Sequence, residues 1–227
     1  MKYKLKILLL CLSLPIWLNS LSVFSQVEKT QGIKSEKKKK KLIAQKNQTP
    51  PKPTVPKGNV EVVIVTSMGE IKLDLFKQKD PITVNNFLNY VKSSYYNNTI
   101  FHRVIDGFII QGGAYDVNFT EKENKLAPIK NMSSLGLKNT TGTIAMARKP
   151  NSADSATSQF FINLANNNTL DCKDNQDGYT VFGKVISGME VVQKIAKIKI
   201  GQREGMYNVP FYPKEALIQT VSIKESQ

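Results

Sequence analysis

The spacing of apolar and polar residues along the chain predicts the order of its elements. The segment "VEVVIVTSMGEIKLDLF" predicts two strands joined by a tight turn at Met68-Gly69. In the second of these strands, Ile71, Leu73 and Leu75 alternate with polar residues. This alternation is typical of a strand that buries one face and exposes the other.

The next segment, "KDPITVNNFLNYVKSSYY", predicts an amphipathic helix. It opens with Asp80, which suits the N-cap position, and with Pro81, which suits the first helical position. Its apolar residues recur at the spacing that forms one helix face. These residues are Val84, Phe87, Leu88 and Val91.

Short strands and one further helix are predicted beyond this point. We expect strands at about 99–105, 108–112, 142–147, 158–163 and 179–185, whereas the stretch 115–141 lacks a period and predicts a loop. "GMEVVQKIAKI" predicts the second helix and "EALIQTVSIK" a closing strand. Roughly eight strands and two separated helices favour a mainly β fold, a closed eight-stranded antiparallel β-barrel capped by two helices.

The N-terminus has the order of a signal peptide. A basic start, "MKYKLK", precedes the apolar run "ILLLCLSLPIWL" and the small residues of "SVFSQ", which predicts cleavage after Ser25. The run is short for a membrane span of about 20 residues, and an uncleaved anchor reaching Phe24 is the alternative. Cleavage would remove Cys11 and leave Cys172 without a partner for an intramolecular disulfide.

Residues 26–58 predict a disordered linker that leads into a domain at 59–227. The linker holds ten lysines against two glutamates, and therefore most of the net charge of +14. It has too few apolar residues to offset the entropy lost on ordering. Its "KKKKK" run could attract an anionic membrane or nucleic acid by charge alone, but a solvated spacer is the simpler interpretation. We expect no specific nucleic-acid partner.

The strand predicted at 99–105 holds the only histidine of the chain beside an arginine. Strand alternation places His102 and Arg103 on opposite faces, with His102 toward the barrel interior. This predicts a structural role for His102. The guanidinium of Arg103 stays protonated, so it cannot act as a general acid or base, but it can serve as a fixed electrostatic donor.

Three motifs in order carry a resemblance to a known family. They are "FHRVIDGFIIQGG", "GTIAMARKPNSADSATSQFFINLANNNTLD" and "YTVFGKVISGMEVV". Together, over roughly residues 61–224, the chain closely resembles the cyclophilin family of peptidyl-prolyl isomerases, and most of all its secreted bacterial members. The resemblance implies a surface groove for X-Pro segments, proline-containing polypeptide partners, a monomer, and folding of exported proteins in a bacterial periplasm.

The resemblance also assigns roles to individual residues. Arg103 matches the catalytic arginine of the family, and Gln111 matches the glutamine that orients it. The matched substrate-binding residues are Phe108, Ile109 and Phe161 in the walls of the proline pocket, Ala147 and Arg148 on the strand that pairs with the peptide, and Gln159, Leu170 and Tyr179 on the rim. Thr169 stands where family members often have Trp or Phe, which speaks against strong cyclosporin binding.

The chemistry of X-Pro isomerisation suits such a set of residues. Amide resonance opposes rotation with a barrier of about 18–20 kcal/mol, but no bond has to break. The reaction therefore needs no nucleophile, metal or other cofactor. It is helped by a donor aimed at the prolyl nitrogen, which Arg103 can supply, and by an apolar pocket that fixes the proline ring.

Other functions fit the sequence less well. A serine hydrolase would need His102 with Ser155 or Ser158, and neither serine lies in a nucleophile-elbow pattern. The segment "DCKDNQDG" fails the calcium-loop spacing, because Lys173 would stand at the first ligand position. The remaining alternative is a proline-peptide binding module or holdase chaperone with little turnover; Arg103 argues against it, and Thr169 leaves room for it.

Overall fold

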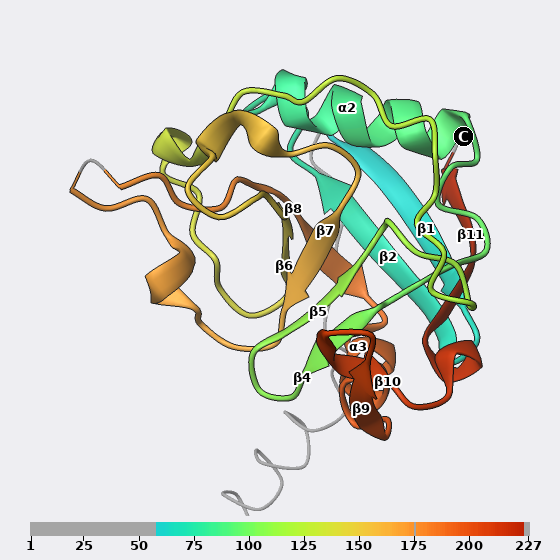
Figure 1. Cartoon of the computed structure of the whole chain (residues 1–227). Helices are drawn as coiled ribbons and strands as arrows, with labels where there is room; N and C mark the ends of the chain where they lie inside the picture. Colours follow the sequence, from blue (N-terminus) through green and yellow to red (C-terminus); the bar gives the residue numbers. More distant parts are fainter. Residues whose placement is uncertain (1–57, 175, 225–227) are drawn as a thin grey trace, which may run out of the picture. The chain divides into compact units, whose positions relative to one another are not determined.

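One antiparallel sheet of nine strands organises the chain. The computed structural model describes residues 58–174 and 176–224, so the predicted signal peptide and the predicted linker up to residue 57 lie outside the described residues. The strand order is β3-β11-β1-β2-β8-β6-β7-β5-β4 (Figure 1). The strands are β1 (Val60–Thr66), β2 (Gly69–Leu75), β3 (Thr99–Ile100), β4 (Arg103–Ile105), β5 (Ile109–Gly112), β6 (Thr143–Met146), β7 (Phe160–Asn163), β8 (Val181–Ser187) and β11 (Leu217–Ile223).

The first hairpin and the first helix confirm the predictions made from spacing. β1 pairs with β2 along its whole length around the turn before Gly69. Helix α2 (Pro81–Lys92) begins after Asp80, whose Oδ1 accepts a hydrogen bond from the backbone N–H of Thr83 at 2.9 Å. The apolar face of α2 is buried, as predicted. A satisfied N-cap of this kind typically stabilises a helix by about 1 kcal/mol.

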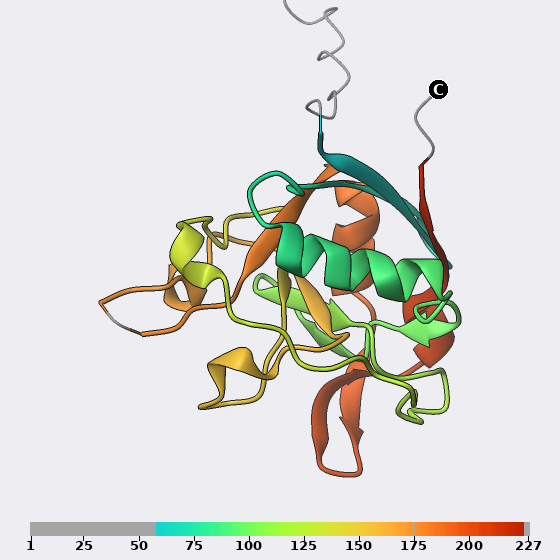
Figure 2. The ribbon, with the colours of Figure 1, turned by 90° about the horizontal axis from the view of Figure 1, so that it is seen from above.

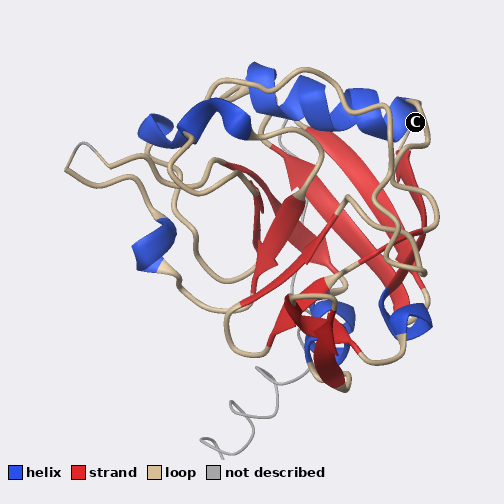
Figure 3. Ribbon diagram, in the orientation of Figure 1, coloured by secondary structure: helices blue, strands red, loops and turns tan. Residues whose placement is uncertain are grey.

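The sheet curls, but its strands form an open order with two ends rather than the predicted closed barrel of eight strands. The sheet is open because the strand predicted over 99–105 breaks at Phe101 and His102 into two strands, β3 and β4. β3 pairs with β11, whereas β4 pairs with β5. The two ends of the sheet are therefore consecutive in the chain, and the sheet curls round between them (Figure 3).

The core fills the inside of this curl. In the register of β4, β5, β7 and β6, four aliphatic residues stand side by side, all fully buried. They are Val104, Ile110, Ile162 and Ile144. Helices α2 and α3 (Met189–Ala196) cover opposite ends of the curled sheet (Figures 1 and 2). Phe87 of α2 packs edge-on against Phe160 at 5.5 Å between ring centroids.

A second, two-stranded sheet was not predicted. β9 (Ile200–Arg203) and β10 (Met206–Pro210) form a hairpin that projects from the main sheet (Figure 2), and β10 lies against β4. Glu204 and Gly205 both have positive φ, as a two-residue hairpin turn of this kind requires. Glu-Gly is not among the pairs that usually signal such a turn, which is why the sequence pattern missed it.

The predicted loop at 115–141 is confirmed, with one short 3-10 helix, η1 (Ser133–Leu135), inside it. Three further 3-10 helices connect strands elsewhere: η2 (Ala153–Ser155), η3 (Asn168–Leu170) and η4 (Pro213–Ala216). Within residues 58–174 and 176–224, none of the helices has the length and apolar character needed to cross a membrane.

Candidate active site

A single cross-strand row forms the base of the site. Arg103 stands opposite Gln111, Gln111 opposite Phe161, Phe161 opposite Ala145 and Ala145 opposite Val181, across β4, β5, β7, β6 and β8. Directly opposed residues share one face of a sheet. Since the neighbouring row fills the core, this row lies on the outer face.

Hydrogen bonds between side chains hold the polar end of the row. The Nη1 of Arg103 donates to Oε1 of Gln111 at 3.2 Å, and Nε2 of Gln111 donates to Oε1 of Gln159 at 2.9 Å. The structure thus brings together Arg103, Gln111 and Gln159, which are three of the polar residues that the sequence predicted for the site. The chain of bonds fixes the direction of a half-buried guanidinium, so little reorganisation would be needed for it to act as a hydrogen-bond donor.

The apolar end of the row belongs to a hydrophobic cluster separate from the main core. All six apolar or aromatic residues predicted for substrate binding fall in this cluster. They are Phe108, Ile109, Ala147, Phe161, Leu170 and Tyr179. Ile109 and Phe161 are buried at its base, and the other four are half-buried.

Four further members of the cluster were missed: Phe76, Leu137, Ala145 and Val181. Ala145 and Val181 could have been found by extending the strand alternation from Phe161 across the sheet. Phe76 and Leu137 come from loops, where no period marks a side chain as facing the site.

An aromatic wall closes one side of this cluster. The Arg148 guanidinium lies over the Tyr179 ring at 4.8 Å from its centroid, and Tyr179 meets Phe161 edge-on at 5.6 Å. The Nη2 of Arg148 also donates to the carbonyl of Asp177 at 2.6 Å, which fixes the stack. Thr169, on η3, is exposed. Tyr179, and not the residue at position 169, therefore supplies the aromatic surface on this side of the cluster.

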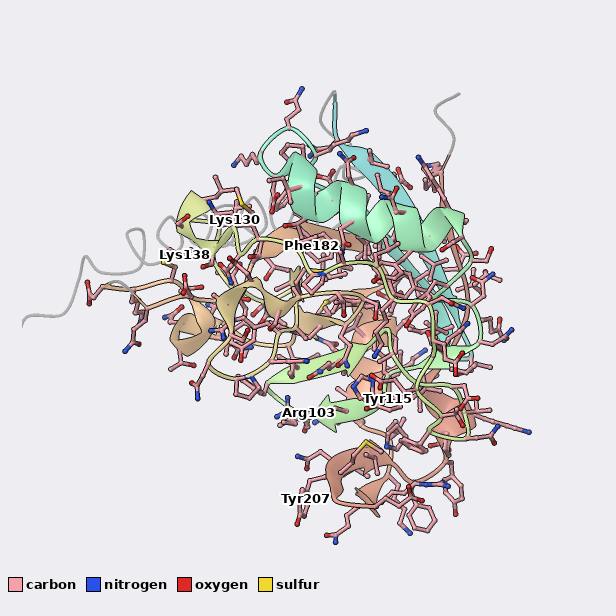
Figure 4. The ribbon with its side chains drawn as sticks, turned by 45° about the horizontal axis from the view of Figure 1, so that its top comes forward. Arg103, Tyr115, Lys130, Lys138, Phe182 and Tyr207 are labelled. Carbon is pink, nitrogen blue, oxygen red and sulfur yellow. The ribbon has the colours of Figure 1, made fainter. Side chains whose placement is uncertain are left out.

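His102 is buried, as predicted, but it does not lie away from Arg103. The two residues line the same pocket, of about 350 Å³, together with Tyr115, Gln159 and residues 206–209 of β10. The prediction that His102 and Arg103 lie on opposite faces was wrong, because the strand breaks at Phe101 and His102 and the two-residue period ends there. Figure 4 shows Arg103 and Tyr115 close to the hairpin that carries Tyr207.

Burial lowers the pKa of His102 to about 4, and the nearby Arg103 guanidinium acts in the same direction. The Gln159 side chain and the backbone at Ile100 raise this pKa and offset only part of the effect. His102 is thus neutral in the range where histidines usually titrate.

The serines of the hydrolase alternative have structural surroundings. The Ser155 hydroxyl donates to the Ser152 carbonyl at 2.6 Å and accepts from the Lys149 N–H at 2.8 Å. Ser158 is fully buried. Both hydrogen bonds of the Ser155 hydroxyl are therefore made to the backbone of the loop that carries it.

Comparison with known proteins agrees with this geometry. The model of the family "Cyclophilin type peptidyl-prolyl cis-trans isomerase/CLD" matches residues 61–225. A peptidyl-prolyl cis-trans isomerase of Acinetobacter baylyi is 49% identical over 171 residues, which cover 75% of this chain and 90% of that protein. Peptidyl-prolyl cis-trans isomerase B of Escherichia coli is 45% identical, covering 72% of this chain and 99% of that protein.

A solved structure also matches. The crystal structure of a Cryptosporidium parvum cyclophilin-type isomerase superposes with a TM-score of 0.62 at 27% identity, covering 74% of this chain and 99% of that one. A second structure of that protein, in the presence of the dipeptide Ala-Pro, gives a TM-score of 0.60. The chain belongs to the cyclophilin-type peptidyl-prolyl cis-trans isomerases, and the resemblance seen in its motifs is confirmed.

The depressed pKa of His102 predicts a pH dependence of stability. The unfolded chain takes up a proton near pH 6.5, whereas the folded protein takes it up only near pH 4. Stability therefore falls as pH drops through this window, because the unfolded state binds more protons. Between pH 7.5 and pH 5, we expect the free energy of unfolding to lose about 2 kcal/mol through this group.

Urea denaturation of the wild type and of His102→Gln at both pH values measures this effect. The difference between the two proteins removes the shared contribution of other titrating groups. An equal pH dependence in both would contradict the assignment. We also expect His102→Gln to lower stability more than activity, and the wild type to show no rate change centred near pH 6.5.

Proposed function

We propose that this enzyme accelerates rotation about X-Pro bonds in exported polypeptides, without a covalent intermediate, with Arg103 as electrostatic donor to the prolyl nitrogen. The observation that carries the proposal is the Arg103 guanidinium, held by Gln111 at the edge of an apolar cluster. As the C–N bond twists, resonance is lost and the lone pair localises on nitrogen. A donor aimed at that nitrogen then stabilises the twisted state more than the planar one.

The apolar cluster supplies the second requirement, which is orientation. Ile109, Phe161 and Leu170 offer a surface for the proline ring, while the preceding carbonyl swings. The Ala147 N–H donates to the Gln159 carbonyl at 2.9 Å, which fixes the segment that would run beside the peptide. The Ala-Pro dipeptide named with the Cryptosporidium parvum structure supports a proline-containing substrate.

Removal of the Arg103 donor tests this mechanism. We expect Arg103→Ala to lower kcat/KM for a proline tetrapeptide by about 10²- to 10³-fold, the usual effect of losing one preorganised donor, with the fold unchanged. A protease-coupled isomerase assay measures the rate. Lys92→Ala, which removes an exposed cation on α2 outside the row, is the control and should keep wild-type activity.

Near wild-type turnover by folded Arg103→Ala would exclude Arg103 as the donor. Absent turnover in the wild type, with retained binding of the peptide, would instead favour the holdase alternative.

Export is the second part of the proposal. The basic, apolar and small-residue order of the first 25 residues supports a signal peptide, and with it a periplasmic role in the folding of exported proteins. When the full chain is expressed in a bacterium, we expect the periplasmic fraction to hold a protein that begins at Gln26. Mass spectrometry of the intact protein measures this. A full-length chain in the membrane fraction would support the uncleaved anchor instead.

The lysine-rich linker gives a separate prediction. If "KKKKK" attaches the enzyme to anionic lipid, the attraction is at most about 1 kcal/mol per lysine and must weaken as salt rises. Co-sedimentation with phosphatidylserine vesicles across a salt series compares residues 26–227 with residues 59–227. Attachment predicts salt-sensitive binding by the longer chain only, whereas no binding by either would leave the linker as a solvated spacer. In both cases we expect equal isomerisation of short peptides by the two chains. Equal sedimentation of the two would exclude the linker as the attachment.

A further inference from the structure

The β9–β10 hairpin exposes an unusual amount of apolar surface. Tyr207 is the most exposed large apolar or aromatic side chain in residues 58–174 and 176–224, at 64%. Ile200, Phe211 and Tyr212, in or just after the hairpin, are exposed as well. Exposed apolar side chains that gather in one place mark interaction surfaces. Because β10 lies against β4, the strand that carries Arg103, an interaction with the substrate of the active site is the one to consider.

A pocket joins the hairpin to the active site. It has a volume of about 350 Å³. One side is formed by Met206, Tyr207, Asn208 and Val209 of β10, and the other by His102, Arg103, Tyr115 and Gln159. Arg103 and Gln159 belong to the hydrogen-bonded chain described above. The pocket therefore shares Arg103 and Gln159 with the candidate active site.

A β-bulge in β10 shapes this side of the pocket. The register with β9 shifts between Tyr207 and Val209, and Asn208, left without a partner, has a φ of 58°. In a regular strand only alternate side chains face one side, but four consecutive residues of β10 line this pocket. Bulges break that alternation and are common beside active sites, where they redirect a side chain.

Stacked cations hold the hairpin in place. The Arg203 guanidinium lies 5.1 Å from the centroid of the Phe119 ring, and the Lys199 ammonium lies 4.3 Å from that of Phe211. The first contact ties β9 to the loop at 115–141, and the second ties the residue before β9 to the segment that follows β10. The pocket wall is thus supported from outside by residues that do not line the pocket.

The lining defines the ligand that would fit. Met206, Tyr207 and Val209 offer a thioether, an aromatic ring and an aliphatic group, and none of the eight lining residues carries a carboxylate. Arg103 is the one residue with a permanent charge among these eight. The volume admits a side chain of the size of phenylalanine. Such a surface favours a large apolar or aromatic group over a small or a basic one.

We propose that this pocket is a second substrate subsite, which binds a large apolar or aromatic side chain of a residue flanking the X-Pro bond. The proposal rests on isomerase activity at Arg103 and adds a source of sequence preference to it. Tyr207, as its exposed wall, is the specificity-determining residue.

Two pairs of tetrapeptides test the subsite: Ala-Ala-Pro-Ala against Ala-Ala-Pro-Phe, and Ala-Ala-Pro-Ala against Phe-Ala-Pro-Ala. Exchange NMR measures cis–trans rates for each without a coupling protease. We expect the wild type to turn over the Phe peptide of at least one pair about fivefold to tenfold faster than its partner. In Tyr207→Ala, and in the same direction in Met206→Ala, this ratio should fall toward one.

Matched variants separate the subsite from a general effect. Tyr212→Ala removes another exposed tyrosine, at 53%, that does not line the pocket, and it should keep the wild-type ratio. Tyr207→Phe should keep it too, because it retains the ring. Equal turnover of both peptides in each pair by the wild type, or a ratio unchanged in folded Tyr207→Ala, would overturn the subsite while leaving the isomerase intact. No turnover of any peptide would overturn both.

Discussion

The register between five neighbouring strands is the constraint on which the rest of this structure depends. Because side chains alternate, one row of opposed residues fills the core and the next row forms the site. Ile162 lies in the first row and Phe161 in the second, one residue apart. A slip of one residue in β4 would turn Arg103 toward the core, and the same slip in β7 would turn Ile162 away from it, each at a cost in solvation.

The site divides its work between two kinds of contact. In the proposed mechanism, Arg103 is the electrostatic donor, and its hydrogen bond to Gln111 fixes the guanidinium before a substrate arrives. In the same mechanism, the apolar cluster around Phe161 would orient the proline ring by packing alone. The Arg148 guanidinium stacks on the Tyr179 ring, and this pair forms an aromatic wall, whereas Thr169 is exposed. A site of this kind needs only shape and a preset donor for a reaction in which no bond breaks.

The break at Phe101 and His102 has consequences beyond the sheet. It gives the sheet two ends that are consecutive in the chain, and it brings His102 to the same pocket as Arg103. Burial keeps the pKa of His102 low, so the imidazole adds no second positive charge beside the guanidinium at neutral pH. The β9–β10 hairpin closes the other side of that pocket.

Local pattern alone was enough to predict β1, β2 and α2, since alternation and capping around Asp80 act within a few residues. The motifs also indicated the site residues, which the fold gathers from β4, β5 and β7 and from the segments that connect strands. Other features depended on tertiary structure. The break at His102 follows from a change of strand partner, from β11 to β5, which no local period records. The pocket at Tyr207 arises because β10 packs on β4, about a hundred residues away in sequence, and such contacts are decided only when the chain folds.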